Sequence, residues 1–140
     1  MYIVIGSDHA GYELKEYIKK YLSKVDCTIC DVGTYTEESC DYPDIADKIR
    51  KKIVFADDMG IAICGTGIGI SMACNRFTDI RCALCHNSFT GKMAREHNNA
   101  NILALGAKIV SPFNAIRIIH AFLNTEFEGG RHQRRLRKLH

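Results

Sequence analysis

Short apolar runs alternate with amphipathic stretches along the whole of this chain. Apolar runs of about five residues are typical of strands that are buried on both faces of a sheet. Five such strands are predicted, at residues 2–6, 28–32, 60–64, 80–85 and 101–105. Because helical patterns separate them, the sequence predicts an α/β fold, a Rossmann-like three-layer sandwich with a five-stranded parallel sheet and a C-terminal helical tail.

Between the predicted strands, apolar residues recur at helical spacing. A helix from about residue 10 to residue 24 carries Leu14, Ile18 and Leu22 on one stripe. Further helices are predicted to begin near Pro43, to follow the glycines of residues 65–69, to span residues 88–97, and to begin at Pro112 with Ser111 as its cap. The chain lacks linkers and repeats, so we expect a single domain over residues 1–140, with residues 126–140 as a basic extension.

Composition agrees with one globular domain. The chain has 140 residues, of which 46% are apolar and 25% charged, and this length is sufficient to bury a core without disulfide or metal support. Its apolar stretches are too short to span a bilayer, and Asp8 and His9 interrupt the first of them before it reaches the length of a signal peptide. The expected location is therefore the cytoplasm, with no membrane partner.

Charge is distributed unevenly around a net value of +3. Residues 131–140 contain five Arg and Lys and no acid, which leaves 14 basic and 16 acidic residues in residues 1–130. A basic tail suits nucleic acid, an acidic partner or a phosphorylated small molecule, and charge alone leaves these three open.

Seven cysteines include two C-x-x-C pairs, Cys27/Cys30 and Cys82/Cys85. Both pairs lie in β-like runs, where positions i and i+3 point to opposite faces, so neither pair is suited to share a metal or to open a redox helix. We expect all seven to be buried, reduced thiols of a cytosolic protein, with Cys64 the one candidate for chemistry.

Ligands of open parallel sheets bind beyond the carboxyl ends of the strands. This rule selects residues 7–9, 64–69, 86–87 and 106–108. The spacing Gly65-x-Gly67-x-Gly69 before a helix suits an anion, because glycines let backbone N–H groups approach it, although a tight strand-to-helix turn also requires glycine. The segment lacks the Lys-Ser/Thr of a P-loop.

Cys64 ends a strand and faces a predicted helix N-terminus, a position that favours the thiolate and a role as base. The alternative is a small buried apolar residue. After the first strand, Asp8 is placed to bind a hydroxyl and His9 a phosphate, whereas an ordinary solvated turn would also accept them. A carboxylate at this point disfavours a dinucleotide cofactor.

Two further candidates lie late in the chain. His97 ends a helix near the fifth strand and is a natural proton carrier, although a histidine there is also typical of a cap or a surface group. If residues 131–135 are helical, Arg131 and Arg135 lie at i and i+4 on one face and form a fork for one phosphate.

Several segments together resemble one family, the type B ribose-5-phosphate isomerases and their galactose-6-phosphate isomerase relatives. The matching segments are Gly6-Ser-Asp-His-Ala-Gly, Asp41-Tyr-Pro, Ile63-Cys-Gly-Thr-Gly-Ile-Gly-Ile-Ser, Asn75-Arg-Phe, Arg95-Glu-His-Asn and Gly129-Gly-Arg-His-Gln-Arg-Arg. They follow the order of the family from residue 6 to residue 135, and their combination is highly specific.

The resemblance implies an aldose-ketose isomerase that needs neither metal nor cofactor and converts ribose 5-phosphate to ribulose 5-phosphate through an enediolate. It also implies the roles of individual residues: Cys64 as base with Thr66 assisting; the backbone of Gly65, Thr66, Gly67, Ile68 and Gly69 as the site of the enediolate oxygen; His97 in ring opening; Asp8, Tyr42 and Asn98 on hydroxyls; and His9, Arg131 and Arg135 on phosphate. Whether Asp8 or His97 dominates ring opening stays open.

At two positions the chain differs from some members of the family. Ile70 stands where some members carry a glutamate base, which places the chain with the cysteine branch. Lys108 stands where a phosphate-binding arginine is expected and retains the charge without the bidentate fork. The resemblance further implies a homodimer, or a dimer of dimers, with active sites shared across the interface.

Two alternatives remain. A hexose-phosphate isomerase of the same family, acting on galactose 6-phosphate or allose 6-phosphate, would use the same residues in a deeper pocket. A nucleotide- or nucleic-acid-binding module would use the glycine loop and the basic tail, and its binding would depend strongly on salt. We expect a sugar phosphate as the ligand and no nucleic acid.

Overall fold

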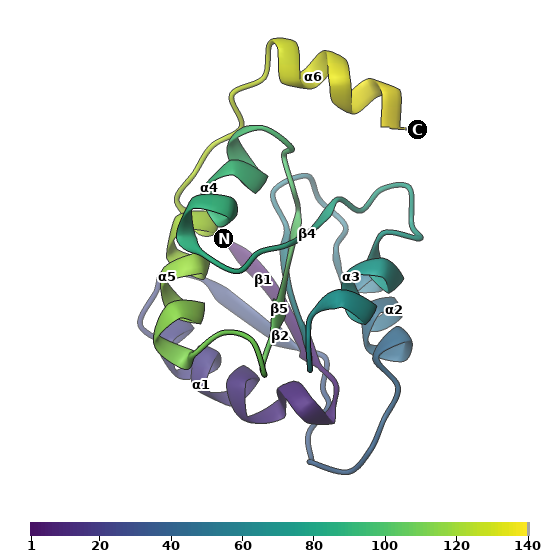
Figure 1. Ribbon diagram of the computed structural model, residues 1–140, viewed down its shortest axis with the longest axis vertical. Helices are drawn as coiled ribbons and strands as arrows, with labels where there is room; N and C mark the ends of the chain where they lie inside the picture. The colour runs from purple at the N-terminus through teal and green to yellow at the C-terminus, as the bar shows by residue number, and fades with distance from the viewer. Residues whose placement is uncertain (140) are drawn as a thin grey trace.

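The computed structural model describes residues 1–139 as strands that alternate with helices (Figure 1). The strands are β1 (Tyr2–Ser7), β2 (Thr28–Asp31), β3 (Met59–Cys64), β4 (Cys82–Leu84) and β5 (Ile102–Gly106). The helices are α1 (Tyr12–Leu22), α2 (Tyr42–Lys52), α3 (Ile68–Cys74), α4 (Ser88–Glu96), α5 (Pro112–Leu123) and α6 (Arg131–Leu136), with 3₁₀ turns η1 (His9–Gly11) and η2 (Arg137–Leu139). Within residues 1–139, no helix combines the length and apolar character needed to cross a membrane.

Five parallel strands form one sheet in the order β2-β1-β3-β5-β4, which confirms the predicted α/β architecture. Strand β4 is shorter than the predicted span of residues 80–85. Ile80 and Cys85 are buried as the apolar pattern requires, but they lie outside the ladder, which pairs only Cys82–Leu84 with β5. The Cys85 N–H still donates to the Ala104 carbonyl of β5 at 3.2 Å, so backbone contact with β5 continues to the end of the predicted span on that side.

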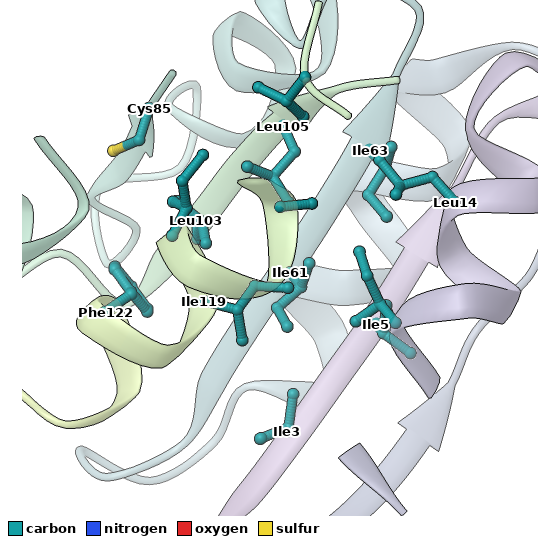
Figure 2. Close-up of a cluster of buried hydrophobic side chains, with 14 of the residues drawn as sticks. Ile3, Ile5, Leu14, Ile61, Ile63, Cys85, Leu103, Leu105, Ile119 and Phe122 are labelled. Atoms are coloured by element: carbon teal, nitrogen blue, oxygen red, sulfur yellow. The ribbon is translucent and has the colours of Figure 1, made fainter. Parts of the chain in front are cut away.

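Helices cover both faces of the sheet. Helices α1, α4 and α5 bury apolar side chains against one face, and α2 and α3 cover the other. Figure 2 shows the first core, in which Ile5, Ile61 and Leu103 of three neighbouring strands face Ile119 and Phe122 of α5. Because helices cover both faces of the sheet, the strands are apolar along their whole length and not in alternation.

Helix ends follow the predicted signals. The Ser111 hydroxyl accepts the N–H of Asn114 at the start of α5, and both α2 and α5 have a proline in their first turn. The first helix begins later than predicted, because Asp8 caps the short turn η1 before α1. The tail is helical over Arg131–Leu136, as predicted.

The cysteine predictions are confirmed in part. All seven are free thiols. Cys27 and Cys30 pack on opposite sides of the sheet, as do Cys82 and Cys85, which confirms that neither pair is arranged for a shared ligand. The expectation that all are buried is wrong for Cys27, Cys30, Cys40 and Cys82, which are half-buried because they lie on edge strands or in a loop.

One charged side chain lies fully inside the fold. Lys15 of α1 has 0% exposure, and its Nζ donates to Asp31 Oδ2 at 2.6 Å and to Glu16 Oε1 at 3.0 Å. Lys19 Nζ reaches the same Asp31 oxygen at 2.8 Å. Burial raises the pKa of the Asp31 carboxyl, but hydrogen bonds from Lys15, Lys19 and the Gly33 N–H outweigh burial and hold that pKa below its usual value.

This ion pair predicts a loss of stability in acid. Because the pKa of Asp31 is lower in the folded than in the unfolded chain, the pair stabilises the fold above the unfolded pKa of about 3.9, and this contribution is lost as pH falls through the folded pKa. Urea unfolding at pH 6 and pH 3 should show a smaller pH dependence for Asp31→Asn than for the wild type. Asp47→Asn, which removes an exposed partner of Lys51, should keep the dependence of the wild type. Equal pH dependence in Asp31→Asn and the wild type would contradict this account.

Candidate functional site

The sheet has its topological switch point between β1 and β3, at the carboxyl ends of these two strands. These strands are neighbours, yet the chain leaves β1 for β2 on one side and leaves β3 for the β5 side, so the loops after them separate. Asp8 follows β1 and donates its N–H to the Ile63 carbonyl of β3 at 3.1 Å. Cys64 is the last residue of β3. The first predicted site residues therefore lie side by side.

The glycine loop wraps around the Cys64 thiol. Cys64 is 4% exposed, and its Sγ accepts the N–H of Gly67 at 3.2 Å. Gly67 has φ +77°, and a Cβ added there would lie 2.5 Å from Leu84 Cδ1 and 2.9 Å from the Leu105 carbonyl carbon, so only glycine fits. The loop thus places a backbone N–H donor against the Cys64 sulfur.

Thr66 supports this loop. Its Oγ1 accepts the N–H of Ile68 at 3.3 Å, where α3 begins. Both residues are exposed, so their side chains lie at the surface and not in the core. Ile70 is fully buried in the core between the sheet and α2, in a position unsuited to proton transfer.

Asp8 and His9 are held by backbone donors. Asp8 is buried, and its Oδ1 accepts the Gly11 N–H at 3.2 Å. His9 Nδ1 accepts the Cys40 N–H at 3.2 Å. A neutral imidazole that accepts at Nδ1 carries its proton on Nε2, so His9 keeps one N–H donor for a ligand.

Tyr42 and Lys108 complete this edge. The Tyr42 ring lies against Gly69, where an added Cβ would come within 2.6 Å of Tyr42 Cζ. Lys108 donates its backbone N–H to the Gly65 carbonyl at 2.9 Å, and its side chain passes the Cα of Gly65. We call the residues gathered here the thiol half-site: Asp8, His9, Tyr42, Cys64, Gly65, Thr66, Gly67, Ile68, Gly69 and Lys108.

His97 and Asn98 lie at the opposite side of the sheet, where the amino ends of the strands are. Helix α4 starts after the carboxyl end of β4 and runs back, so that it ends, just before these residues, near the amino end of β5. A strand of five residues is about 17 Å long, and this length separates the two edges. Within the described chain, His97 is therefore remote from Cys64.

The basic tail joins His97 at this edge. Helix α6 lies beyond the end of α4, at the opposite end of the molecule from the start of α1 (Figure 1). The His97 and His132 rings stack with centroids 4.2 Å apart. A hollow of about 260 Å³ is lined by both histidines together with Asn98 and Arg135. We call His97, Asn98, Arg131 and Arg135 the arginine half-site.

His132 was not among the residues selected from the sequence. It is 6% exposed, and its Nε2 lies 3.7 Å from Glu128 Oε2. Burial lowers the pKa of His132, assisted by the neighbouring His97, Arg131 and Arg135, against the opposite effect of Glu128. In the sequence, His132 could have been selected from its spacing of four residues from Glu128 across the Gly-Gly turn, which allows the two side chains to interact.

His97, Glu128 and His132 are the one group within residues 1–139 with metal-ligand atoms this close, all within 4.8 Å of one another. The planes of the two imidazole rings differ by only 11°. A metal ion lies near the plane of each imidazole that binds it, and two stacked parallel rings have no such common point. The arrangement therefore suits a stacked histidine pair better than a metal centre.

The predicted site residues thus form two sets in one chain. The thiol half-site lies at the carboxyl edge of the sheet and the arginine half-site at the amino edge. The fold brings together the members of each set but does not bring the two sets together.

Comparison with known proteins gives consistent matches over nearly the full length. The sequence profile of a family described as Ribose/Galactose Isomerase matches residues 3–139. Ribose-5-phosphate isomerase B of Escherichia coli strain K12 is 39% identical over 135 residues, covering 96% of this chain and 91% of that protein.

Solved structures agree with the sequence comparison. The ribose-5-phosphate isomerase B of Clostridium thermocellum superposes with a TM-score of 0.96 at 47% identity, covering 99% of this chain and 95% of that one. The enzyme of Mycoplasma genitalium, solved with bound ribulose-5-phosphate, gives a TM-score of 0.90 at 41% identity, covering 99% and 93% of the two chains.

Proposed function

Because the chain belongs to the ribose/galactose isomerase family, we propose that it interconverts D-ribose 5-phosphate and D-ribulose 5-phosphate. The observation that carries this proposal is the Cys64 thiol enclosed by the glycine loop, with the Gly67 N–H directed at its sulfur. Relatives of similar sequence that carry this activity, one of them solved with bound ribulose-5-phosphate, support the choice of substrate.

Cys64 is the proposed base. The thiolate removes the proton from C2 of the open-chain aldose, the C2–H electron pair forms the C1–C2 double bond, and negative charge develops on O1. Backbone N–H groups of residues 65–69 stabilise this enediolate oxygen, an effect that amounts to about 3 kcal/mol per donor in comparable sites. The thiol then returns the proton to C1, and the O2 proton passes to O1 with Thr66 assisting, which leaves the ketone at C2.

The remaining residues of the thiol half-site position the sugar. Asp8 and Tyr42 bind hydroxyls, and the His9 Nε2–H and the Lys108 ammonium face the phosphate. The single N–H that His9 keeps is consistent with this assignment, because its other nitrogen is engaged by Cys40. Lysine gives Lys108 a charge without a bidentate fork, so this contact is weaker than an arginine contact.

A second copy of the chain supplies the arginine half-site in this proposal. His97 opens the sugar ring, Asn98 binds a hydroxyl, and Arg131 and Arg135 bind phosphate across a dimer interface. The separation of the two half-sites along the strands supports this arrangement, since one chain alone offers only one of them to a given sugar. The assembly is a homodimer or a dimer of dimers.

Two further features fit the same activity. Seven free thiols are typical of a reducing compartment, and we place the enzyme in the cytoplasm. The proposal treats residues 1–140 as one sugar-phosphate isomerase domain, with residues 126–140 as the basic arm that reaches the partner. It requires no cofactor or metal.

A direct assay tests the substrate. We expect kcat/KM on ribose 5-phosphate to exceed that on galactose 6-phosphate or allose 6-phosphate by at least about 100-fold, because an added carbon must be accommodated between fixed anchors. Ketose formation is followed with each sugar phosphate at equal enzyme concentration. Clear preference for a hexose phosphate would identify the related six-carbon isomerase instead. Absence of turnover together with salt-dependent binding of RNA or DNA would favour the nucleic-acid module.

A further inference from the structure

Lys15 is the largest fully buried charged side chain of the described fold, yet it belongs to neither half-site. Its ammonium lies between the rings of Tyr12 and Tyr35, at 5.5 and 5.6 Å from their centroids, and is bonded to Asp31. Burying a lysine is unfavourable unless its partners are fixed in place. We propose that the Lys15–Asp31 pair is a positioning device that holds the loop of residues 33–41, and through it His9, in the geometry that binds phosphate.

The first step of this argument is the anchoring of the start of the loop. Asp31 ends β2 and uses its other carboxylate oxygen, Oδ1, to accept the Gly33 N–H at 2.8 Å. Gly33 in turn accepts the Ser7 N–H at 2.7 Å, and the Ser7 carbonyl accepts the Thr34 N–H at 2.7 Å. Ser7 immediately precedes Asp8, so the ion pair is connected to the thiol half-site through three hydrogen bonds.

The second step concerns the rest of the loop. The Tyr35 hydroxyl donates to the Asp31 carbonyl at 3.0 Å, and its ring covers Lys15, so the loop is attached to the ion pair a second time. At its far end, the Cys40 N–H is the donor that fixes the ring of His9. A shift of the loop therefore moves that donor and releases the imidazole.

Lys19 provides a matched control for Lys15. It bonds the same oxygen of Asp31 at 2.8 Å, and it lies one turn further along the same helix. The Lys19 side chain is 31% exposed, so water can take the place of its ammonium when Lys19 is substituted. The Lys15 ammonium is buried, so no water replaces its hydrogen bond to Asp31 when Lys15 is substituted. The two lysines share their carboxylate partners, and they differ in burial and in the Tyr12 and Tyr35 rings that lie against Lys15.

The test compares Lys15→Met with Lys19→Met, using kinetics on ribose 5-phosphate, the Ki of inorganic phosphate and the iodoacetamide alkylation rate of Cys64 by peptide mass spectrometry. For Lys15→Met we expect KM and the phosphate Ki to rise about tenfold, the loss of one charge-assisted contact, with kcat and the Cys64 rate within about twofold of the wild type. Lys19→Met should change each value by less than about twofold. Amide hydrogen exchange over residues 33–41 should accelerate only in Lys15→Met.

The inference rests on the proposed function, but it fails separately. If the wild type turns over ribose 5-phosphate while folded Lys15→Met keeps its KM and phosphate Ki, the positioning role is wrong and the isomerase stands. If KM, kcat and Cys64 alkylation all change together, Lys15 is only structural. If the wild type lacks turnover, the positioning role is still tested by amide hydrogen exchange over residues 33–41 and by phosphate binding, each compared between Lys15→Met and Lys19→Met. If Lys15→Met does not fold, Asp31→Asn is measured in the same way and must raise the phosphate Ki.

Discussion

Replacing Cys64 by alanine should reduce kcat on ribose 5-phosphate by at least about 1,000-fold while the fold is retained. The thiol is the proposed base, and removal of a general base typically costs 10²- to 10⁴-fold in rate. Its loss also leaves the Gly67 N–H without its acceptor. Steady-state kinetics give the rate, and circular dichroism with thermal unfolding shows that the variant is folded.

Cys74→Ala is the matched control for this prediction. Cys74 is also buried, packs in the same apolar core on the same face of the sheet, and lies at the end of α3, away from the glycine loop. Both substitutions remove one sulfur from a packed core, so their losses of stability should be similar. Only Cys64→Ala should lose turnover. A Cys64→Ala variant that retains a tenth of the activity of the wild type would assign the base to another group.

The fold could be predicted from sequence because the signal is repeated. Each strand is an apolar run that is dry on both faces, and each intervening helix repeats its apolar stripe, so one imprecise boundary changes little. Strand β4 shows the limit. Ile80 and Cys85 have the burial of strand residues, but pairing at a sheet edge depends on a neighbour that the local sequence does not describe.

The site was predictable only in part, for a geometrical reason. Residues at the carboxyl end of a strand or directly after it, such as Cys64 and Asp8, are placed by the rule for parallel sheets. His97 follows a helix, and a helix after a strand returns the chain to the opposite edge. The resemblance to a known family grouped His97 with Cys64, and the structure of one chain separates them.

Lys15 was missed because its position gives no chemical signal. It lies three residues before Ile18 and seven before Leu22, within the apolar stripe of α1. A lysine in that stripe is usually explained by an aliphatic stem that reaches water with its charged end. Only the fold places Asp31, at the end of β2, beside Lys15 of α1, because the two residues are sixteen positions apart in sequence.

Mixing two inactive variants should restore activity if the half-sites meet across a dimer. One variant is Cys64→Ala, and the other is Arg131→Ala/Arg135→Ala, which loses two charge-assisted phosphate contacts of about 1.5–3 kcal/mol each and thus at least about 100-fold in kcat/KM. In a mixed dimer, one site combines both defects, and the other combines an intact thiol half-site with an intact arginine half-site. With random pairing, half of the dimers are mixed, so the expected activity is about a quarter of the wild-type value.

The measurement requires exchange of subunits, which is ensured by unfolding and refolding the two variants together. Each variant refolded alone is the control and must stay inactive, and a mixture left unexchanged should match their sum. A mixture of Cys64→Ala with Cys64→Ala/Arg131→Ala/Arg135→Ala must also stay inactive, because no pairing of these chains contains the thiol. If the exchanged mixture of the first two variants shows no recovery, both half-sites serve a single chain, and α6 must then leave its position at the amino edge of the sheet to reach Cys64.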